Sequence, residues 1–192
     1  GGGISCVNSS PTLNNLIVTN NVARNVAGGI GLVNSNAIIN NCIIENNSVM
    51  EDDALGGGGI ALNGGNANIS NSIIRNNFVG SNLYQINGGG GLLCGFTFDD
   101  ESMSITLDNV TISNNVANIG AGIGALSGDI FLNRCIISQN IGEYGSTISL
   151  GEPLGLIVDE INITILNSTM TENEGSISIG MINSSVLNMV NS

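Results

Sequence analysis

Runs of acidic residues are the feature of this 192-residue chain that most resembles a chemical site. They are Glu51-Asp52-Asp53, Asp99-Asp100-Glu101 and Asp159-Glu160. Because Ca²⁺ prefers carboxylate oxygens, Asp99, Asp100 and Glu101 are the best candidates for a metal site. The alternative is that all these runs are solvated loops that keep the net charge away from zero.

Catalysis on a polysaccharide would need further groups. A lyase needs Arg or Lys to stabilise an enolate-like charge, and a hydrolase needs two or three carboxylates side by side. The basic residues are Arg24, Arg75 and Arg134, and there is no His. In the fold inferred below, Asp99 and Asp159 share an edge but lie two repeats apart, about 10 Å. We therefore expect no enzymatic activity and no cofactor other than possible calcium.

Composition excludes several kinds of partner. Three basic residues against 15 acidic ones give a net charge of −12, which rules out binding to nucleic acid or to an anionic membrane through a basic patch. Hydrophobic residues make up 42% of the chain, enough to form a core. Gly and Asn interrupt every apolar run, so no segment reaches the length of a spanning helix.

An apolar-x-x-Asn unit recurs along the whole chain. Its Asn residues are Asn21, Asn47, Asn77, Asn115, Asn140 and Asn173, at intervals of 26, 30, 38, 25 and 33 residues. Six residues earlier is a second polar column: Asn15, Asn41, Asn71, Asn109, Arg134 and Asn167. Eight residues earlier is an apolar column: Leu13, Ile39, Ile69, Leu107, Leu132 and Ile165.

A second segment lies between these units and is Gly-rich in the first repeats. It aligns Ile4, Ile30, Ile60, Leu92, Ile123, Ile148 and Ile177 in one column. Short β-branched runs that alternate with period two indicate strands. About three strands per repeat predict an all-β, single-stranded parallel β-helix of six to seven coils, with each strand about 4.8 Å from its equivalent. We interpret residues 1–192 as one such domain, a fragment of a longer chain.

The Asn and Gly residues have structural roles in this interpretation. A corner between strands needs positive φ or a side chain that bonds to turn backbone, and Asn provides both. Stacked Asn amides can also bond to one another as a ladder. We expect Gly28-Gly29, Gly56–Gly59 and Gly88–Gly91 to be turn glycines.

The four Cys residues could form disulfides only across the core, as Cys6–Cys42 and Cys94–Cys135. Within a column, Cys6 and Cys94 would lie three rungs apart, about 14 Å, beyond the reach of a bridge. The other interpretation is that all four are free, buried and apolar in character.

One outward column is unusually aliphatic. Alternation places Ile17, Ile43, Ile73 and Ile136 outside, together with Thr111 and Thr169. An exposed aliphatic stripe often marks a contact, so it predicts lateral packing, whereas β-propensity alone is the competing explanation. The ends of a solenoid are unpaired strand edges, which require caps in missing sequence or end-to-end stacking into a filament.

The motifs Gly29-Ile30 with Ile44-Glu45-Asn46-Asn47, and Gly59-Ile60 with Ile74-Arg75-Asn76-Asn77, resemble the repeats of chlamydial polymorphic outer-membrane proteins. More broadly they resemble bacterial secreted right-handed β-helix proteins. The resemblance implies right-handed winding and an extracellular or cell-surface location. We therefore expect a non-catalytic module: an adhesin stalk, a passenger or a filament subunit. It would contact copies of itself, other surface proteins or glycans. A carbohydrate-binding or polysaccharide-cleaving β-helix is the alternative.

Overall fold

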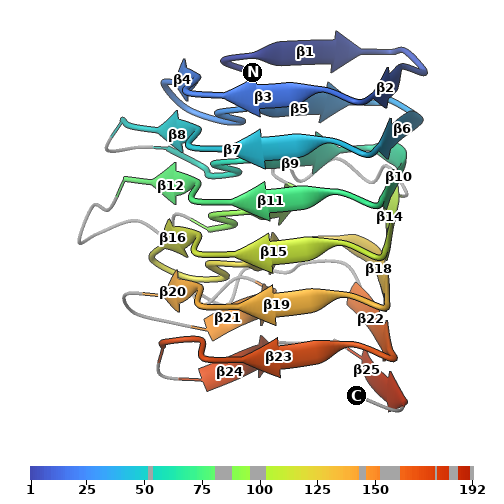
Figure 1. The fold of residues 1–192 in the computed structure, drawn as a ribbon, viewed down its shortest axis with the longest axis vertical. Helices are drawn as coiled ribbons and strands as arrows, with labels where there is room; N and C mark the ends of the chain where they lie inside the picture. Colours follow the sequence, from blue (N-terminus) through green and yellow to red (C-terminus); the bar gives the residue numbers. More distant parts are fainter. Residues whose placement is uncertain are drawn as a thin grey trace.

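In the computed structural model, the described strands are parallel and stack in four sheets (Figure 1). The structure describes residues 1–51, 54–80, 88–95, 103–142, 146–151, 161–175, 177–181 and 186–190. No helix occurs among these residues. Each strand pairs with the strand that follows one repeat later, so the predicted parallel β-helix is confirmed. The direction of winding and the number of coils stay predictions.

The strands of each sheet are named here in stacking order. Sheet A contains β1 (Ile4–Val7), β5 (Ile30–Val33), β9 (Ile60–Asn63), β13 (Leu92–Cys94), β17 (Ile123–Ala125), β21 (Ser146–Leu150) and β24 (Ile177–Met181). Sheet B contains β2 (Thr12–Asn14), β6 (Ala37–Asn40), β10 (Gly65–Ser70), β14 (Met103–Asp108), β18 (Gly128–Asn133), β22 (Ile161–Leu166) and β25 (Val186–Val190). Sheet C contains β3 (Ile17–Thr19), β7 (Ile43–Glu45), β11 (Ile73–Arg75), β15 (Thr111–Ser113), β19 (Ile136–Ser138) and β23 (Thr169–Thr171). Sheet D contains β4 (Val22–Ala23), β8 (Ser48–Val49), β12 (Phe78–Val79), β16 (Val116–Ala117) and β20 (Ile141–Gly142).

Sheet D was not anticipated, because the sequence predicted about three strands per repeat. Its strands are two residues long and directly follow the apolar-x-x-Asn unit. A two-residue strand shows no alternation that could be read from sequence, so only the pairing of stacked backbones reveals it.

The predicted columns are correct over most of the chain. Ile30 pairs with Ile60, and Ile39 pairs with Ile69, as the alignment of repeats requires. The last step in sheet A is wrong: Ile148 pairs with Ile179 rather than with Ile177. A shift by two residues keeps the same side chains inward, so periodicity does not distinguish the two registers. No Gly-Gly pair precedes β24 to fix the alignment.

Aliphatic columns fill the interior between the sheets. Ile30, Ile39, Ile44 and Ile60 are fully buried in one continuous cluster. Each fully buried Ile or Leu contributes about 1.5–3 kcal/mol relative to an exposed one. Repetition of these columns gives every rung a similar core, while repeat length varies in the connections between strands.

The Asn of each apolar-x-x-Asn unit points inward and forms the predicted ladder. Asn77 Oδ1 accepts hydrogen bonds from the backbone N and from Nδ2 of Asn47, at 3.0 and 3.1 Å. Asn77 Nδ2 in turn donates to Asn115 Oδ1 and to the Ile44 carbonyl, both at 3.0 Å. The same amide-to-amide contact joins every step from Asn21 to Asn173. Asn47, Asn77, Asn115 and Asn140 are completely buried.

Positive φ occurs at different residues from those of this ladder. The Asn15 column has positive φ at all six positions, including 54° at Arg134. In the apolar-x-x-Asn unit, positive φ falls on the residue before the ladder Asn, such as 54° at Asn76 and Asn114. The ladder Asn residues therefore bond without positive φ, whereas the Asn15 column combines both predicted roles, since Asn41 Nδ2 also donates to Asn15 Oδ1.

Among the predicted turn glycines, Gly56, Gly57 and Gly89 have positive φ, whereas Gly29 and Gly59 are needed for close stacking. A Cβ at Gly29 would lie 2.5 Å from the carbonyl oxygen of Gly59, and the same clash repeats between Gly59 and Gly91. The backbones of adjacent rungs therefore approach too closely here for any larger residue.

Replacing Asn77 by Ala should lower the free energy of unfolding by about 3 kcal/mol or more. The buried backbone N–H of Asn47 loses its acceptor, and Asn47 Nδ2, the Ile44 carbonyl and Asn115 Oδ1 each lose one hydrogen bond. Urea unfolding followed by circular dichroism would measure the loss. Asn68→Ala, on the exposed side of β10, is the control and should change stability by less than about 0.5 kcal/mol. Equal effects of the two substitutions would contradict the ladder's role.

Asn114 tests the turn alone, because it is exposed and has a φ of 54°. Asn114→Ala should cost about 1 kcal/mol, since a Cβ disfavours this conformation, whereas Asn114→Gly should remain within about 0.5 kcal/mol of the parent. Thermal unfolding of both variants measures the difference. If Ala and Gly are equally tolerated, the positive φ is not needed there.

Candidate functional site

The predicted interaction stripe forms one column on the outer face of sheet C. Ile17 pairs with Ile43, Ile43 with Ile73, Ile73 with Thr111, Thr111 with Ile136, and Ile136 with Thr169. Ile17 is 65% exposed and Ile136 is 47% exposed, while Ile43 and Ile73 are half-buried. Whether another molecule covers the stripe stays a prediction.

A shallow groove of about 270 Å³ runs along the N-terminal half of the stripe. Its lining residues are Asn15, Leu16, Ile17, Asn41, Cys42, Ile43, Asn71 and Ile73. Asn41 Nδ2 donates to Asn15 Oδ1 at 2.6 Å, which holds the amides of adjacent rungs together along the groove. The groove therefore combines an aliphatic wall with a row of neutral amides.

A second outward column of sheet C carries an ion pair next to the stripe. Nε of Arg75 donates to Oε2 of Glu45 at 2.7 Å, and the two residues pair across β7 and β11. The Glu45 side chain is 19% exposed and that of Arg75 is 43% exposed. The other members of this column are Thr19, Ser113, Ser138 and Thr171. The outer face of sheet C thus has no net charge, although the whole chain carries −12.

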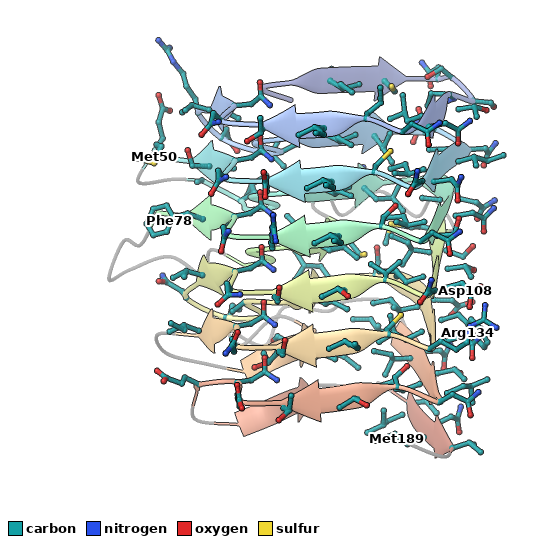
Figure 2. The ribbon with its side chains drawn as sticks, viewed as in Figure 1. Met50, Phe78, Asp108, Arg134 and Met189 are labelled. Atoms are coloured by element: carbon teal, nitrogen blue, oxygen red, sulfur yellow. The ribbon has the colours of Figure 1, made fainter. Side chains whose placement is uncertain are left out.

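The other two Arg side chains are paired as well. Arg24 Nε lies 3.6 Å from Glu51 Oε1. Arg134 bonds to Asp108, and Figure 2 shows the two residues together at the edge of the stack. Asn133 Nδ2 also donates to Asp108 Oδ1 at 2.8 Å. Each basic group therefore joins neighbouring rungs through a carboxylate.

The predicted calcium ligands Asp99, Asp100 and Glu101 lie outside the described residues, as do Asp52, Asp53, Asp159 and Glu160. Among the residues that are described, no three His, Cys, Asp or Glu side chains form a group that could hold a metal ion. The metal prediction is therefore neither confirmed nor contradicted.

All four cysteines are free, which confirms the second interpretation and makes the pairings across the core wrong. Three of them are buried as predicted, but Cys6 is half-buried. Cys42 Sγ donates to the carbonyls of Leu13 and Asn40 at 3.4 and 3.3 Å. One rung on, Ser72 Oγ donates to the Ser70 carbonyl at 2.6 Å. The thiol thus occupies a position where a hydroxyl also serves, which explains a buried Cys that needs no partner thiol.

Sheet D adds an apolar column that the sequence analysis missed. Its members are Val22, Ser48, Phe78, Val116 and Ile141. Val22 is 64% exposed, and Phe78 projects outward from β12 in Figure 2. In the sequence, this column is visible as the apolar residue that directly follows most of the ladder Asn residues. It could be recognised as a column only once β12 and its equivalents were known to be strands.

Comparison with known proteins finds no matching family model, no matching curated protein and no matching solved structure. The resemblance to chlamydial outer-membrane repeats therefore stays a prediction that rests on the quoted motifs. Across the part of the chain that the structure describes, no helix has the length and apolar character needed to cross a membrane.

Burial raises the pKa of the Cys94 thiol from 9.0 to about 12. In the unfolded chain this thiol loses its proton near pH 9, so its contribution to stability is complete below pH 9 and decreases as the pH rises towards 12. The free energy of unfolding, measured with urea, should therefore decrease more between pH 8 and pH 11 for the parent chain than for Cys94→Ala. Ala125 occupies the next position of the column, so that rung accommodates Ala. An identical pH dependence in the variant would contradict the assignment.

Proposed function

We propose that this chain is a non-catalytic module of an extracellular or cell-surface protein, serving as an adhesin stalk, a passenger or a filament subunit. The observation that carries the proposal is the unbroken inward ladder from Asn21 to Asn173. Each amide between the two ends contacts the rungs on both sides, so the ladder ties the stack together along its axis. Such a construction gives a stiff spacer whose outer faces can vary.

The basic residues support a structural role over a lyase. Arg75 lies between rungs against Glu45, and Arg134 lies similarly against Asp108. A lyase requires a cation directed at the substrate, whereas these cations neutralise carboxylates of the stack itself. The carboxylates concerned are likewise engaged in contacts between rungs.

The proposed location outside the cell depends on the motif resemblance at Gly29-Ile30 and Ile44–Asn47. The structure is compatible with the oxidising environment there, because three of the four free thiols, those of Cys42, Cys94 and Cys135, are buried.

Antibodies against this chain should label intact, unpermeabilised cells that produce the protein, and added protease should abolish the labelling. A cytoplasmic protein of the same cells is the control and should be labelled only after permeabilisation. Labelling that appears only after permeabilisation would contradict a surface location.

The catalytic alternative is tested on the purified chain with a panel of neutral and acidic polysaccharides. We expect no new reducing ends and no unsaturated products. Product formation that Asp108→Asn or Asp129→Asn abolishes, and that Asn68→Ala leaves unchanged, would instead establish a polysaccharide-cleaving β-helix.

A further inference from the structure

The outer face of sheet C is complementary to itself. We propose that it binds the same face of a second copy of the chain, related by a two-fold axis that runs parallel to the strands and passes between β7 and β11. This inference deepens the proposed structural role by naming a partner, and it rests on that role only in assuming that the module works through its outer faces. A purely monomeric chain would leave the proposed function standing.

The symmetry determines which residues meet. Rotation about this axis keeps each residue's position along its strand and reverses the order of the rungs. Strand β7 therefore lies over β11 of the second copy, and β3 lies over β15 of the second copy. Ile43 faces Ile73 of the second copy, and Ile17 faces Thr111 of the second copy.

The charges are the strongest argument for this arrangement. Glu45 already contacts Arg75 of its own chain at 2.7 Å. In the dimer it also faces Arg75 of the second copy, and each Arg75 likewise faces two carboxylates. Four charges thus alternate in sign around the axis, which favours this register over one that opposes like charges.

The rest of the chain favours the same face. Two molecules of net charge −12 repel each other, and this repulsion is weakest where the meeting surfaces are neutral. Among the outward side chains of sheet C, Glu45 and Arg75 are the charged ones, and they cancel. The aliphatic stripe beside them supplies the apolar area that association covers.

The size of the face predicts weak binding. The two faces overlap over four rungs, about 20 Å along the long axis of the stack, so the area that they bury is smaller than that of a standard interface. We therefore expect an equilibrium between monomer and dimer that depends on protein concentration, rather than a permanent dimer. In an alternative arrangement, the two stacks lie face to face with their long axes parallel and their rungs in the same order. This arrangement would also cover the stripe, but it would place Glu45 over Asn41 of the second copy instead of over a cation.

Sedimentation equilibrium over a range of concentrations tests the charge pattern. Glu45→Arg alone and Arg75→Glu alone should each weaken self-association at least about tenfold, because like charges then meet across the axis. An equimolar mixture of the two variants should restore association, since every cation of one then faces a carboxylate of the other. This rescue also shows that both variants fold.

Asp129→Arg is the matched control, because it makes the same change in charge as Glu45→Arg on the outer face of sheet B, where Asp129 bonds to Asn162. It should not weaken association. A parent chain that stays monomeric at every concentration, or a mixture of variants that fails to associate, would overturn the proposal.

Cross-linking distinguishes the two arrangements. With a bifunctional thiol reagent that spans about 10 Å, the separation of packed sheets, a mixture of Ile17→Cys and Thr111→Cys should yield a covalent dimer joined between these positions. Ile17→Cys alone should not form this dimer. The two introduced thiols would lie three rungs apart along the long axis of the stack, about 14 Å, in addition to the separation of the sheets. A dimer formed by Ile17→Cys alone would show the alternative arrangement with parallel axes and overturn the proposed one. Surface labelling of cells tests the proposed function independently of either result.

Discussion

A buried side-chain amide must find both a donor and an acceptor, and in this protein the four buried ladder Asn residues find them on neighbouring rungs. Asn77 accepts from Asn47 and donates to Asn115, so the amides repeat at the spacing of the strands. A Ser side chain would be too short to bond to both neighbouring rungs. An aliphatic side chain would remove the hydrogen bond that Asn77 Nδ2 donates to the Ile44 carbonyl. The ladder therefore fixes where every coil turns from sheet C into sheet D.

Once the inner contacts are fixed, the outer faces are free to differ. Sheet B carries polar side chains that bond between rungs, such as Ser104 to Asn66 and Asn162 to Asp129. Sheet C carries the aliphatic stripe and one neutralised ion pair. This division explains how a chain of net charge −12 retains one face with no net charge.

Exceptions to the repeat are compensated by their neighbours. Arg134 replaces Asn in the outer turn column, keeps its positive φ of 54° and bonds to Asp108 of the preceding rung. Cys135 lies in the next column, which also contains Ser72 and Ser168, and its thiol donates to the Leu107 and Asn133 carbonyls. Arg134 and Cys135 therefore both make contacts between rungs.

The sequence by itself determined the columns, because the side chains at Ile30, Ile60 and their equivalents repeat wherever a strand repeats. It determined the stripe and the ladder in the same way, since both follow from alternation and from the recurrence of Asn. Only the tertiary structure decided the final register of β24, the existence of sheet D and which Asn turns inward. Periodicity does not distinguish two registers that differ by two residues, does not reveal a strand of two residues and does not tell adjacent Asn residues apart. The hydrogen bonds between stacked rungs do distinguish them, because each register pairs different groups.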